Sequence, residues 1–284
     1  MYNVPRNTFI AMAVAAIADD KKSEPKNKHA GMDSEKLARI PTRMKEFVEK
    51  GTIAGAVILV ARHGVVASLE AVGYQDLVSK TAMRTDTIFN IYSMTKPLTA
   101  VGIMTLLEEG RLTLSDPVEK YLPEFRDQVM VDQREGDKVV TTKKPSRPIT
   151  IRDLLTHTSG MPGGSTPAIQ RDKTLAENIA IFAKELTLEF EPGTKYLYSN
   201  WGFITLGRII EVVSGKPYEE LIEQRITRPL GMKDTFYFPP PEKCDRIASV
   251  YDVEDGKLKK DQTDHCRKRR PYVKIGRASC RERV

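Results

Sequence analysis

The sequence predicts an α/β fold in which an α+β sheet domain carries an inserted, all-helical subdomain. Two short runs of apolar, β-branched residues precede a long apolar helix near residue 100. Helical periodicity then dominates the middle of the chain, and strand-like patterns return from Thr235 onward. A sheet segment, a block of helices and a second sheet segment in this order are typical of a layered domain that another domain interrupts.

The first predicted elements are a helix and a hairpin. Apolar residues recur at helical spacing before residue 50, with Asp33 or Ser34 as the N-cap and with Pro41 expected to kink or split the helix. The apolar runs Gly55–Arg62 and Val65–Val72 flank a turn that contains glycine, which is the pattern of a β-hairpin.

A third strand or extended segment is expected over Thr85–Ile91, and a helix over Ser93–Glu109. This helix is apolar on nearly every side, so we expect it to be buried in the body of the domain. Ser115 and Pro117 indicate the start of another helix. These elements complete residues 32–125, the first part of the predicted sheet domain.

Residues 126–234 are predicted to form the helical subdomain. Its charged first part, Arg126–Pro148, is expected to be an exposed hairpin or a long loop. Four helices are expected after it: Ile151–Thr156, Leu175–Leu186, Trp201–Ser214 and Tyr218–Ile226. Residues 235–274 are predicted to return to the sheet, with a strand over Ile247–Val253 and a turn at Asp255.

The N-terminal end is interpreted separately from the fold. One arginine, an apolar stretch and an Ala-Ile-Ala ending make residues 1–18 a predicted signal peptide, and a charged spacer follows over residues 19–31. The signal peptide would make the protein secreted or periplasmic, and without it the protein would be cytoplasmic. The apolar stretch is too short for a stable membrane span, which needs about 20 residues.

Residues 275–284 resemble the translation of a sequencing-library adapter, so we expect a non-native tail that packs against nothing. On this interpretation the natural chain continues differently after Lys274, and the C-terminal strands of the sheet are missing. A partial sheet has an unpaired edge, and we therefore expect the 284-residue polypeptide to be inactive and prone to aggregation. The alternative is a genuine basic tail.

The composition is that of a soluble globular protein, with 40% apolar and 29% charged residues. Three scattered cysteines exclude a disulfide scaffold and a zinc-ribbon site. The formal net charge of +7 is not gathered in one patch, so no nucleic-acid partner is expected, and the basic run Arg267–Arg270 is interpreted as a solvated loop. The sequence has no metal-ligand spacing and no cofactor fingerprint, and we expect no metal and no cofactor.

Ser93-Met94-Thr95-Lys96 places a hydroxyl and an amine three residues apart, on one face of a helix. A serine is a weak nucleophile until a base takes its proton, and a lysine can be that base where burial favours its neutral form. The helix N-terminus favours developing negative charge, and the Ser93 N–H could form half of an oxyanion hole. A helix-capping serine followed by a surface lysine is the structural alternative. The same spacing at Ser23–Lys26 lacks an apolar helix and is taken as a chance match.

Tyr198-Ser199-Asn200 follows a Pro-Gly turn and precedes a predicted helix. In a functional interpretation, Tyr198 moves protons near the nucleophile and the Asn200 amide orients a substrate carbonyl. In a structural one, Tyr198 packs and Asn200 caps the helix. Tyr196 competes for the catalytic role. His157 could be a general base, but no aspartate is placed to orient it, so it is interpreted as a structural histidine.

Four motifs cover most of the chain: F-x-I-x-S-x-x-K (Phe89–Lys96), L-T-L-S-D-P-V-x-K-Y-L-P-E-F (Leu112–Phe125), I-R-D-L-L-T-H-T-S-G (Ile151–Gly160) and P-G-T-x-Y-x-Y-S-N (Pro192–Asn200). In these motifs the chain resembles the serine β-lactamase-related family, within it the class C β-lactamases, the penicillin-binding D-Ala-D-Ala peptidases and the family VIII carboxylesterases. The resemblance runs from about Met32 to about Asp255. It implies a β-lactamase/transpeptidase-like fold and a serine hydrolase.

The resemblance implies an acyl-enzyme mechanism on an ester, amide or β-lactam carbonyl of a small molecule or peptide. Ser93 would attack the carbonyl, and Lys96 and Tyr198 would share the general-base role. The tyrosine of the family corresponds to Tyr198 rather than Tyr196, and Asn200 would hold the acyl side chain of the substrate.

One element of the family is missing. The family carries K-T-G or H-x-G on a strand at the sheet edge, whereas the only histidine after Asn200 is His265. This absence agrees with the expectation of a chain cut short at Lys274. The alternatives to a hydrolase are a non-hydrolytic sensor that binds β-lactams or peptidoglycan and a structural paralogue. Neither would be expected to keep the complete set of Ser93, Lys96 and Tyr198.

Overall fold

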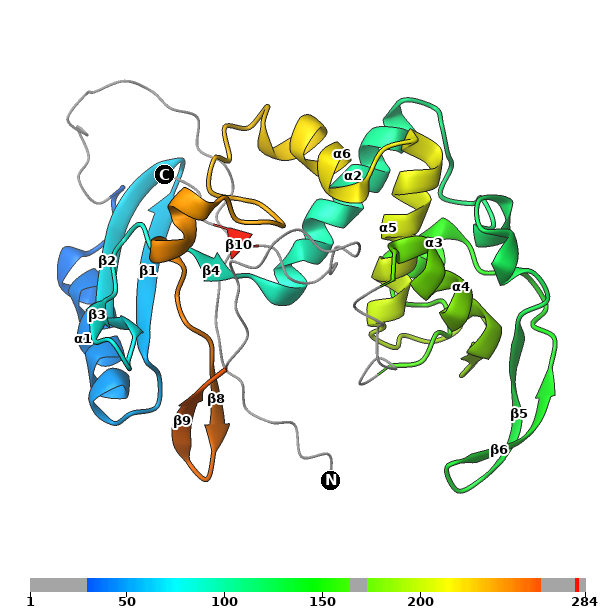
Figure 1. Cartoon of the computed structure of the whole chain (residues 1–284), viewed down its shortest axis with the longest axis horizontal. Coiled ribbons are helices and arrows are strands. Elements are labelled where there is room, and N and C mark those ends of the chain that lie inside the picture. Colours follow the sequence, from blue (N-terminus) through cyan, green and yellow to red (C-terminus); the bar gives the residue numbers. More distant parts are fainter. Residues whose placement is uncertain (1–29, 164–172, 262–278, 281–284) are drawn as a thin grey trace. The chain divides into compact units, whose positions relative to one another are not determined.

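The computed structural model describes residues 30–163, 173–261 and 279–280 (Figure 1). The predicted signal peptide, the chance match at Ser23 and the basic run Arg267–Arg270 lie outside the described residues. The chain forms two compact units. Among the described residues, the first unit holds those up to Ile91, those from Leu230 to Asp261 and residues 279–280. The second unit holds the described residues from Tyr92 to Pro229.

This division differs from the predicted boundaries. The sequence analysis grouped residues 32–125 together, whereas the structure assigns everything from Tyr92 to Pro229 to the second unit. All four predicted site residues, which lie between Ser93 and Asn200, therefore belong to one unit. Their mutual geometry follows from the fold of that unit alone.

The first unit is built on the hairpin of β1 (Gly55–Arg62) and β2 (Val65–Asp76), which pair antiparallel as predicted. His63 and Gly64 form the turn with φ angles of 51° and 76°. Positive φ at both central residues is the geometry of a type I′ turn, whose twist matches that of the strands. β3 (Thr81–Ala82) pairs with the end of β2 and completes a three-stranded sheet.

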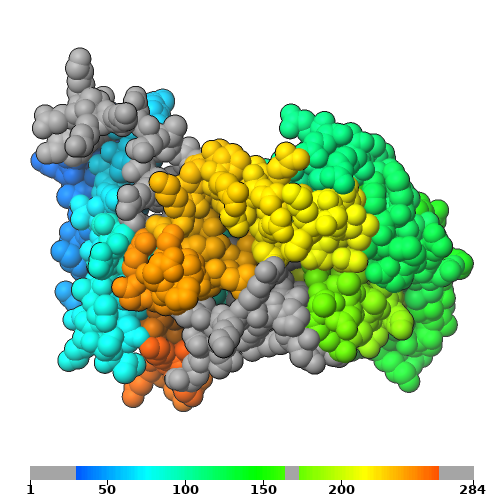
Figure 2. Space-filling view, turned by 45° about the horizontal axis from the view of Figure 1, so that its top comes forward, coloured from blue at the N-terminus to red at the C-terminus, as the bar shows by residue number. Residues whose placement is uncertain are grey.

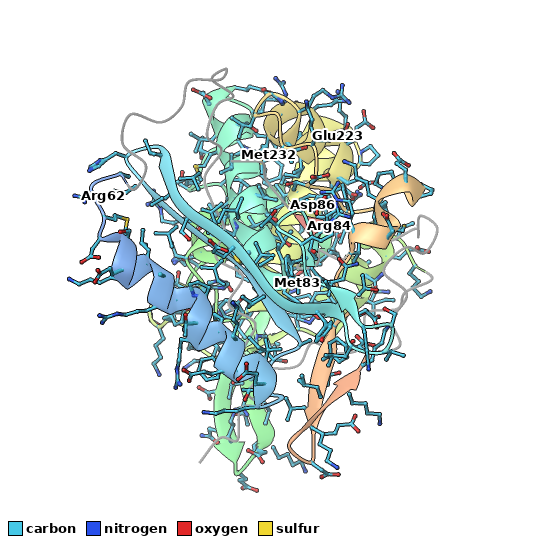
Figure 3. All side chains as sticks on the ribbon, turned by 90° about the vertical axis from the view of Figure 1, so that its left-hand side faces the viewer. Arg62, Met83, Arg84, Asp86, Glu223 and Met232 are labelled. Carbon is cyan, nitrogen blue, oxygen red and sulfur yellow. The ribbon has the colours of Figure 1, made fainter. Side chains whose placement is uncertain are left out.

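The helix α1 (Ser34–Glu49) packs along this hairpin (Figure 3). Asp33 is the N-cap, and its side chain accepts the first free N–H groups of the helix. The expected split at Pro41 does not occur, because α1 is one continuous helix through that residue. Pro41 cannot donate a backbone hydrogen bond within the helix. The packing of α1 on the hairpin, where Leu37 and Ala67 share a buried cluster, supports the helix despite this loss.

The remaining strands of the first unit pair distant segments. β4 (Phe89–Asn90) pairs antiparallel with β10 (Ser279–Cys280), and Ile88 forms a parallel bridge with Ile247. The expectation that residues 275–284 pack against nothing is therefore wrong for the two residues of β10. Long-range pairing of two-residue strands leaves no local pattern in a sequence, which explains why it was not predicted.

A second hairpin, of β8 (Tyr251–Glu254) and β9 (Lys257–Lys260), forms around the predicted turn at Asp255. The 3-10 helix η5 (Pro241–Arg246) comes before it, and its Cys244 is disulfide-bonded. One disulfide-bonded cysteine does not make the disulfide scaffold that the cysteine count excluded.

Arg246 ties three segments of the first unit together. Its guanidinium donates to the Asp86 carbonyl at 2.8 and 3.0 Å and to the Asp234 carboxylate at 2.7 and 3.2 Å. The Asp86 carboxylate also accepts two hydrogen bonds from Arg84, and both residues are labelled in Figure 3. Bidentate arginine contacts of this kind fix the mutual orientation of the segments they join.

Three helices in contact with one another form the centre of the second unit: α2 (Thr95–Glu108), α5 (Asn200–Ser214) and α6 (Tyr218–Ile222). Gly102 of α2 permits their close approach, because a Cβ there would lie 2.9 Å from Ile222 Cδ1 and 3.1 Å from Ile210 Cδ1. The green and yellow parts of the chain, which belong to this unit, form one continuous body in Figure 2. α6 continues into η4 (Glu223–Thr227), so the predicted helix Tyr218–Ile226 is present.

The helix α2 is not buried on every side as predicted, since Val101 and Met104 are 45% and 37% exposed. Its buried residues lie on one face at helical spacing: Thr95, Lys96, Thr99, Gly102, Ile103 and Leu106. Hydropathy alone could not locate this face, because three of its members are polar while the apolar Val101 and Met104 are exposed. The polar members include the lysine of the predicted site.

The second unit is not all helical as predicted, although helices and sheets are both present as the α/β class requires. β5 (Val129–Glu135) and β6 (Lys138–Lys143) form a hairpin, which confirms one of the two alternatives given for Arg126–Pro148. β7 (Thr187–Leu188), directly after α4 (Leu175–Glu185), pairs parallel with β5. Two residues are too few to show the alternation that predicts a strand.

The predicted helix start at Ser115 leads only to two short 3-10 turns, η2 (Val118–Lys120) and η3 (Pro123–Phe125). The next helix, α3 (Ile151–Leu155), begins where it was predicted. Thr150 and Asp153 form a complete capping box at its start, so local sequence determines its position.

Candidate active site

Ser93 lies in η1 (Tyr92–Met94), a single 3-10 turn directly before α2. Tyr92 has a φ of 45°, an uncommon conformation for a residue other than glycine, and its carbonyl accepts a hydrogen bond of 2.6 Å from Thr95 Oγ1. This turn leaves the Ser93 side chain exposed at the N-terminal end of α2, where the helix dipole stabilises negative charge. The sequence analysis had made Ser93 the first residue of the helix, whereas α2 begins at Thr95.

Lys96 is buried, with 6% of the residue exposed. Its Nζ donates to Ser93 Oγ at 3.2 Å and to Asn200 Oδ1 at 2.8 Å. The same nitrogen lies 4.7 Å from the ring centroid of Tyr198 and 5.7 Å from that of Phe203. The four residues selected from the sequence therefore meet around one amine, and the surface lysine of the structural alternative is excluded.

The start of α5 brings Asn200 to this amine. Ser199, not Asn200, is the N-cap of α5, and its side chain accepts a hydrogen bond from the Gly202 N–H. The structural alternative for Asn200 is therefore wrong. Because Ser199 satisfies the helix end, the Asn200 amide accepts the hydrogen bond from Lys96 instead.

A turn at His157 holds the segment that carries Tyr198. The His157 carbonyl accepts a hydrogen bond of 2.9 Å from the Leu197 N–H, and its ring atom Nδ1 accepts one of 3.2 Å from the Ser199 N–H. The imidazole lies 4.5 Å from the Tyr198 ring and 5.0 Å from the Phe203 ring, between centroids. The contacts of His157 are those of a structural histidine, but the sequence analysis missed that they are made with the segment that carries Tyr198.

The environment of His157 favours its neutral form. Burial, and secondly the positive charge of Lys96, lower the pKa of His157 below its ordinary value. Because a backbone N–H can only donate, Nδ1 is the unprotonated nitrogen and the ring proton is assigned to Nε2. His157 is thus a neutral acceptor beside Tyr198.

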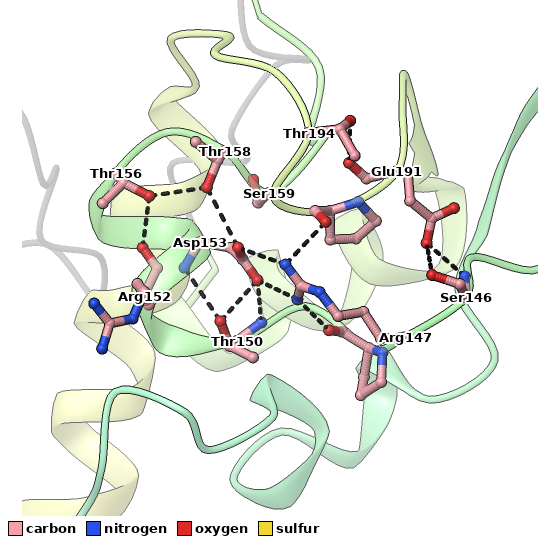
Figure 4. A network of polar contacts seen from close by, with 12 residues as sticks. Ser146, Arg147, Thr150, Arg152, Asp153, Thr156, Thr158, Ser159, Glu191 and Thr194 are labelled. Carbon is pink, nitrogen blue, oxygen red and sulfur yellow. Dashed lines mark hydrogen bonds and ion pairs between the residues drawn. The ribbon is translucent and has the colours of Figure 1, made fainter.

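The ion pair between Arg147 and Asp153 supports this turn (Figure 4). Arg147 makes a bidentate contact with Asp153 at 2.6 and 3.0 Å, and it also donates to the Pro192 carbonyl at 2.8 Å. Asp153 further accepts hydrogen bonds from the N–H and hydroxyl of Thr150. The next residue after Pro192 is Gly193, whose φ of 87° and close contact with Arg147 leave no room for a side chain. The pair thereby joins α3 to the segment that leads to Tyr198.

Replacing Arg147 with methionine is expected to lower the free energy of unfolding by about 2–3 kcal/mol at pH 7, because Asp153 would remain buried without its main partner. Breaking a fully buried pair costs more, about 3–5 kcal/mol, but the Arg147 side chain is 40% exposed and partly screened. Chemical denaturation of both proteins measures this difference. Lys144→Met removes a fully exposed partner of Asp127 and serves as the control, with little expected change.

The difference in the free energy of unfolding between the wild type and R147M should depend on pH. Burial alone would raise the pKa of Asp153, but the hydrogen bonds from Arg147 and Thr150 outweigh it and hold that pKa below its ordinary value. A carboxyl of this kind stabilises the fold above its unfolded-state pKa of about 3.9, and the contribution is lost as pH falls through the folded-state pKa. The difference in the free energy of unfolding between wild type and R147M should therefore become smaller below about pH 4. A difference that is independent of pH would contradict the stabilising role of the Asp153 carboxylate.

The remaining candidates lie at the edge of the site or outside the described residues. Tyr196 is 68% exposed and touches His157 only with a T-shaped ring contact, whereas no contact between Tyr196 and Lys96 is found in the described part of the chain. His265 and Ser23 are not described. Within the described ranges, no group of three or more His, Cys, Asp or Glu residues could hold a metal ion, and no helix combines the length and apolar character needed to cross a bilayer.

Comparison with known proteins identifies the family. The sequence matches the Beta-lactamase family over residues 40–268, most of the chain. The chain belongs to the Beta-lactamase family. Its relatives within this family include Esterase EstB of Burkholderia gladioli, which is 32% identical over 221 residues, or 72% of this chain and 53% of EstB. The D-alanyl-D-alanine-carboxypeptidase/endopeptidase AmpH of Escherichia coli K12 is 36% identical over 166 residues, or 57% of this chain and 40% of AmpH.

Among solved structures, this Beta-lactamase family chain is similar to EstCE1, described as a hydrolase with promiscuous acyltransferase activity. The TM-score is 0.73 at 26% identity, and the match covers 87% of this chain and 69% of EstCE1. The β-lactamase/transpeptidase-like fold expected from the motifs is confirmed. The chain spans about half the length of the curated relatives it matches.

Proposed function

We propose that this Beta-lactamase family chain carries the active site of a serine hydrolase that acts through a covalent acyl-enzyme. The observation that carries the proposal is the hydrogen bond of 3.2 Å between the buried Lys96 Nζ and Ser93 Oγ. A base within hydrogen-bond reach of a serine hydroxyl is the arrangement that activates this weak nucleophile. The relatives named as an esterase and a carboxypeptidase support the same class of reaction.

In the proposed acylation, Ser93 Oγ forms a bond to the substrate carbonyl carbon while its proton passes to the Lys96 and Tyr198 pair. Tyr198 then protonates the leaving alcohol or amine as the bond to the carbonyl carbon breaks. In deacylation a water attacks the acyl carbon and gives a proton to the same pair, which returns one to Ser93 as the ester bond breaks. One water is consumed and every enzyme group is restored.

Two further groups assist this chemistry. The N–H of Ser93, in the turn directly before α2, would donate to the oxyanion, and the dipole of α2 would stabilise the same charge. The Asn200 amide offers both an acceptor and a donor. Its oxygen holds Lys96 at 2.8 Å, and its NH₂ group would bind the acyl side chain of the substrate.

The substrate proposed first is a small-molecule ester. EstB is named an esterase and EstCE1 a hydrolase with acyltransferase activity, and both match a large share of this chain. A peptide ending in D-alanine is the second candidate, because AmpH is named for that activity and is 36% identical over the matched region.

The test is a comparison of p-nitrophenyl butyrate, a D-Ala-D-Ala peptide and a penicillin with the full-length protein. The intact mass of the protein is followed at each time point, and the acylated peptide is mapped. Turnover with a transient acyl group on Ser93 supports the hydrolase, and the fastest substrate identifies its class. A stable acyl group without turnover identifies the sensor instead, and no modification of Ser93 by any of the three would contradict the proposal.

A further inference from the structure

The segment that carries Tyr198 is held by the turn at residues 157–160 through an array of hydrogen bonds. Three are between backbone groups: Glu189 N–H to the Gly160 carbonyl, Gly193 N–H to the Thr158 carbonyl and Leu197 N–H to the His157 carbonyl, at 2.7, 2.8 and 2.9 Å. The fourth replaces a backbone carbonyl by a side chain, since the Ser199 N–H donates to His157 Nδ1. The contact nearest to Tyr198 and Asn200 is therefore the only one of the four that can titrate.

We propose that His157 is a positioning residue of this active site, and that its neutral imidazole, by accepting the Ser199 N–H at Nδ1, holds Tyr198 and Asn200 against Lys96. The inference rests on the function proposed above and gives a role in the site to a residue that the sequence analysis interpreted as structural. His157 does not touch the nucleophile in the described structure, so it acts through Tyr198 and Asn200.

The geometry supports this role on three sides of the imidazole. Nδ1 holds the residue between Tyr198 and Asn200 in sequence. One ring contact, at 4.5 Å between centroids with planes tilted by 32°, is with Tyr198 itself. Phe203, one turn into α5, contacts the same imidazole and also lies below Lys96 Nζ. A displacement of the imidazole would therefore move both the tyrosine and the helix start that presents Asn200.

Protonation of His157 would break this arrangement. A protonated Nδ1 is a donor and would face the Ser199 N–H, which is also a donor. The titratable groups that face the imidazole in the described residues are Lys96 from α2 and the phenols of Tyr196 and Tyr198 from the following segment. None of these groups is a carboxylate, so no acidic side chain among them compensates the charge of an imidazolium. The reaction rate should therefore fall on acidification as pH passes through the pKa of His157, which lies below the ordinary histidine value of about 6.5.

Two substitutions separate the acceptor from the backbone effect. His157 has a φ of 58°, which asparagine and glycine both tolerate better than other residues. His157→Asn keeps an acceptor atom, because Asn Oδ1 is as many bonds from Cα as His Nδ1. His157→Gly keeps the backbone and loses the acceptor. Both variants lose the ring contacts, so their difference reports the hydrogen bond to Ser199.

The exposed His63, with a φ of 51° in the β1–β2 turn, provides the matched control for a histidine-to-asparagine change. We expect His157→Gly to lower kcat roughly 10²-fold with little change in KM, as for a misplaced catalytic group. His157→Asn should retain at least about tenfold more kcat than His157→Gly and should lose the acid limb of the pH profile. His63→Asn should change neither.

The inference is wrong if His157→Gly turns over at the wild-type rate, if His157→Asn is as slow as His157→Gly, or if the acid limb is unchanged in His157→Asn. NMR tests the inference without an activity assay. The ¹⁵N signals of His157 should show Nδ1 unprotonated at neutral pH. The signals of the Ser199 amide and the Tyr198 ring should change as His157 titrates. A proton on Nδ1 at neutral pH, or signals that do not follow it, would overturn the inference. If the wild-type protein were never acylated on Ser93 but the NMR result were as expected, the proposed function would be wrong and the positioning role of His157 would stand.

Discussion

Replacing Ser93 with alanine is expected to abolish acylation of the protein and to lower turnover by roughly 10⁴–10⁶-fold, as loss of the nucleophile does in serine hydrolases. The change deletes one exposed hydroxyl. Lys96 keeps its hydrogen bond to Asn200 and its place over the Tyr198 ring, so the fold and the rest of the site should be unchanged. Steady-state kinetics and intact mass after exposure to a fluorophosphonate measure the two effects.

A matched control comes from the second Ser-x-x-Lys of the sequence. Ser23→Ala carries the same substitution in the charged N-terminal segment, and we expect wild-type labelling and wild-type turnover from it. If Ser93→Ala were still labelled at the wild-type rate, another residue would be the nucleophile, and the hydrogen bond from Lys96 to Ser93 would be only a structural contact.

The elements that the sequence predicted well are those with signals confined to a few residues. The β1–β2 hairpin depends on His63 and Gly64, two consecutive residues that adopt positive φ. The start of α3 depends on the capping box of Thr150 and Asp153, and the end of α5 on Gly215 with a φ of 71°. In each case the physical cause and its consequence lie within one turn of the chain.

The errors arose where a distant segment decides the structure. β7 forms only because β5, more than 50 residues earlier, offers an edge to pair with. α1 continues through Pro41 because the hairpin supports one of its faces. The exposed face of α2 was not predicted because its buried side carries threonine and lysine, which hydropathy places outside. Tertiary packing overrides local propensity in all three elements.

The same distinction applies to the site. The spacing of Ser93 and Lys96 on one helix face could be predicted, because three residues separate them. The contact of Lys96 with Asn200 spans 104 positions, so local geometry could not predict it, and the Tyr-Ser-Asn pattern selected that residue. His157 was overlooked as a partner of Tyr198, although its position in the His-Thr-Ser-Gly motif was noted. Its role depends on which N–H group its ring accepts, and a sequence does not show that.

Replacing Tyr198 with phenylalanine is expected to lower kcat by about 10²–10⁴-fold, the range for loss of general acid–base catalysis. The phenyl ring would keep its contact with His157 and its place 4.7 Å from Lys96 Nζ, so the substitution removes the hydroxyl alone. The loss should affect both steps, because the same hydroxyl protonates the leaving group and helps to activate water. Rapid-quench kinetics should therefore show slower acylation and slower deacylation of Ser93.

Tyr196→Phe is the matched control, because it removes the same hydroxyl from a tyrosine two positions earlier in the sequence. Tyr196 is 68% exposed, and its ring makes only an edge contact with His157. We expect its kcat to stay within about threefold of the wild type, well below the range for a catalytic proton donor. A leaving group that needs no protonation provides a second check: with p-nitrophenyl esters the acylation defect of Tyr198→Phe should be smaller than with alkyl esters. If the effects of the two tyrosine substitutions were reversed, Tyr196 would be the proton donor, and the place of Tyr198 against Lys96 would serve packing alone.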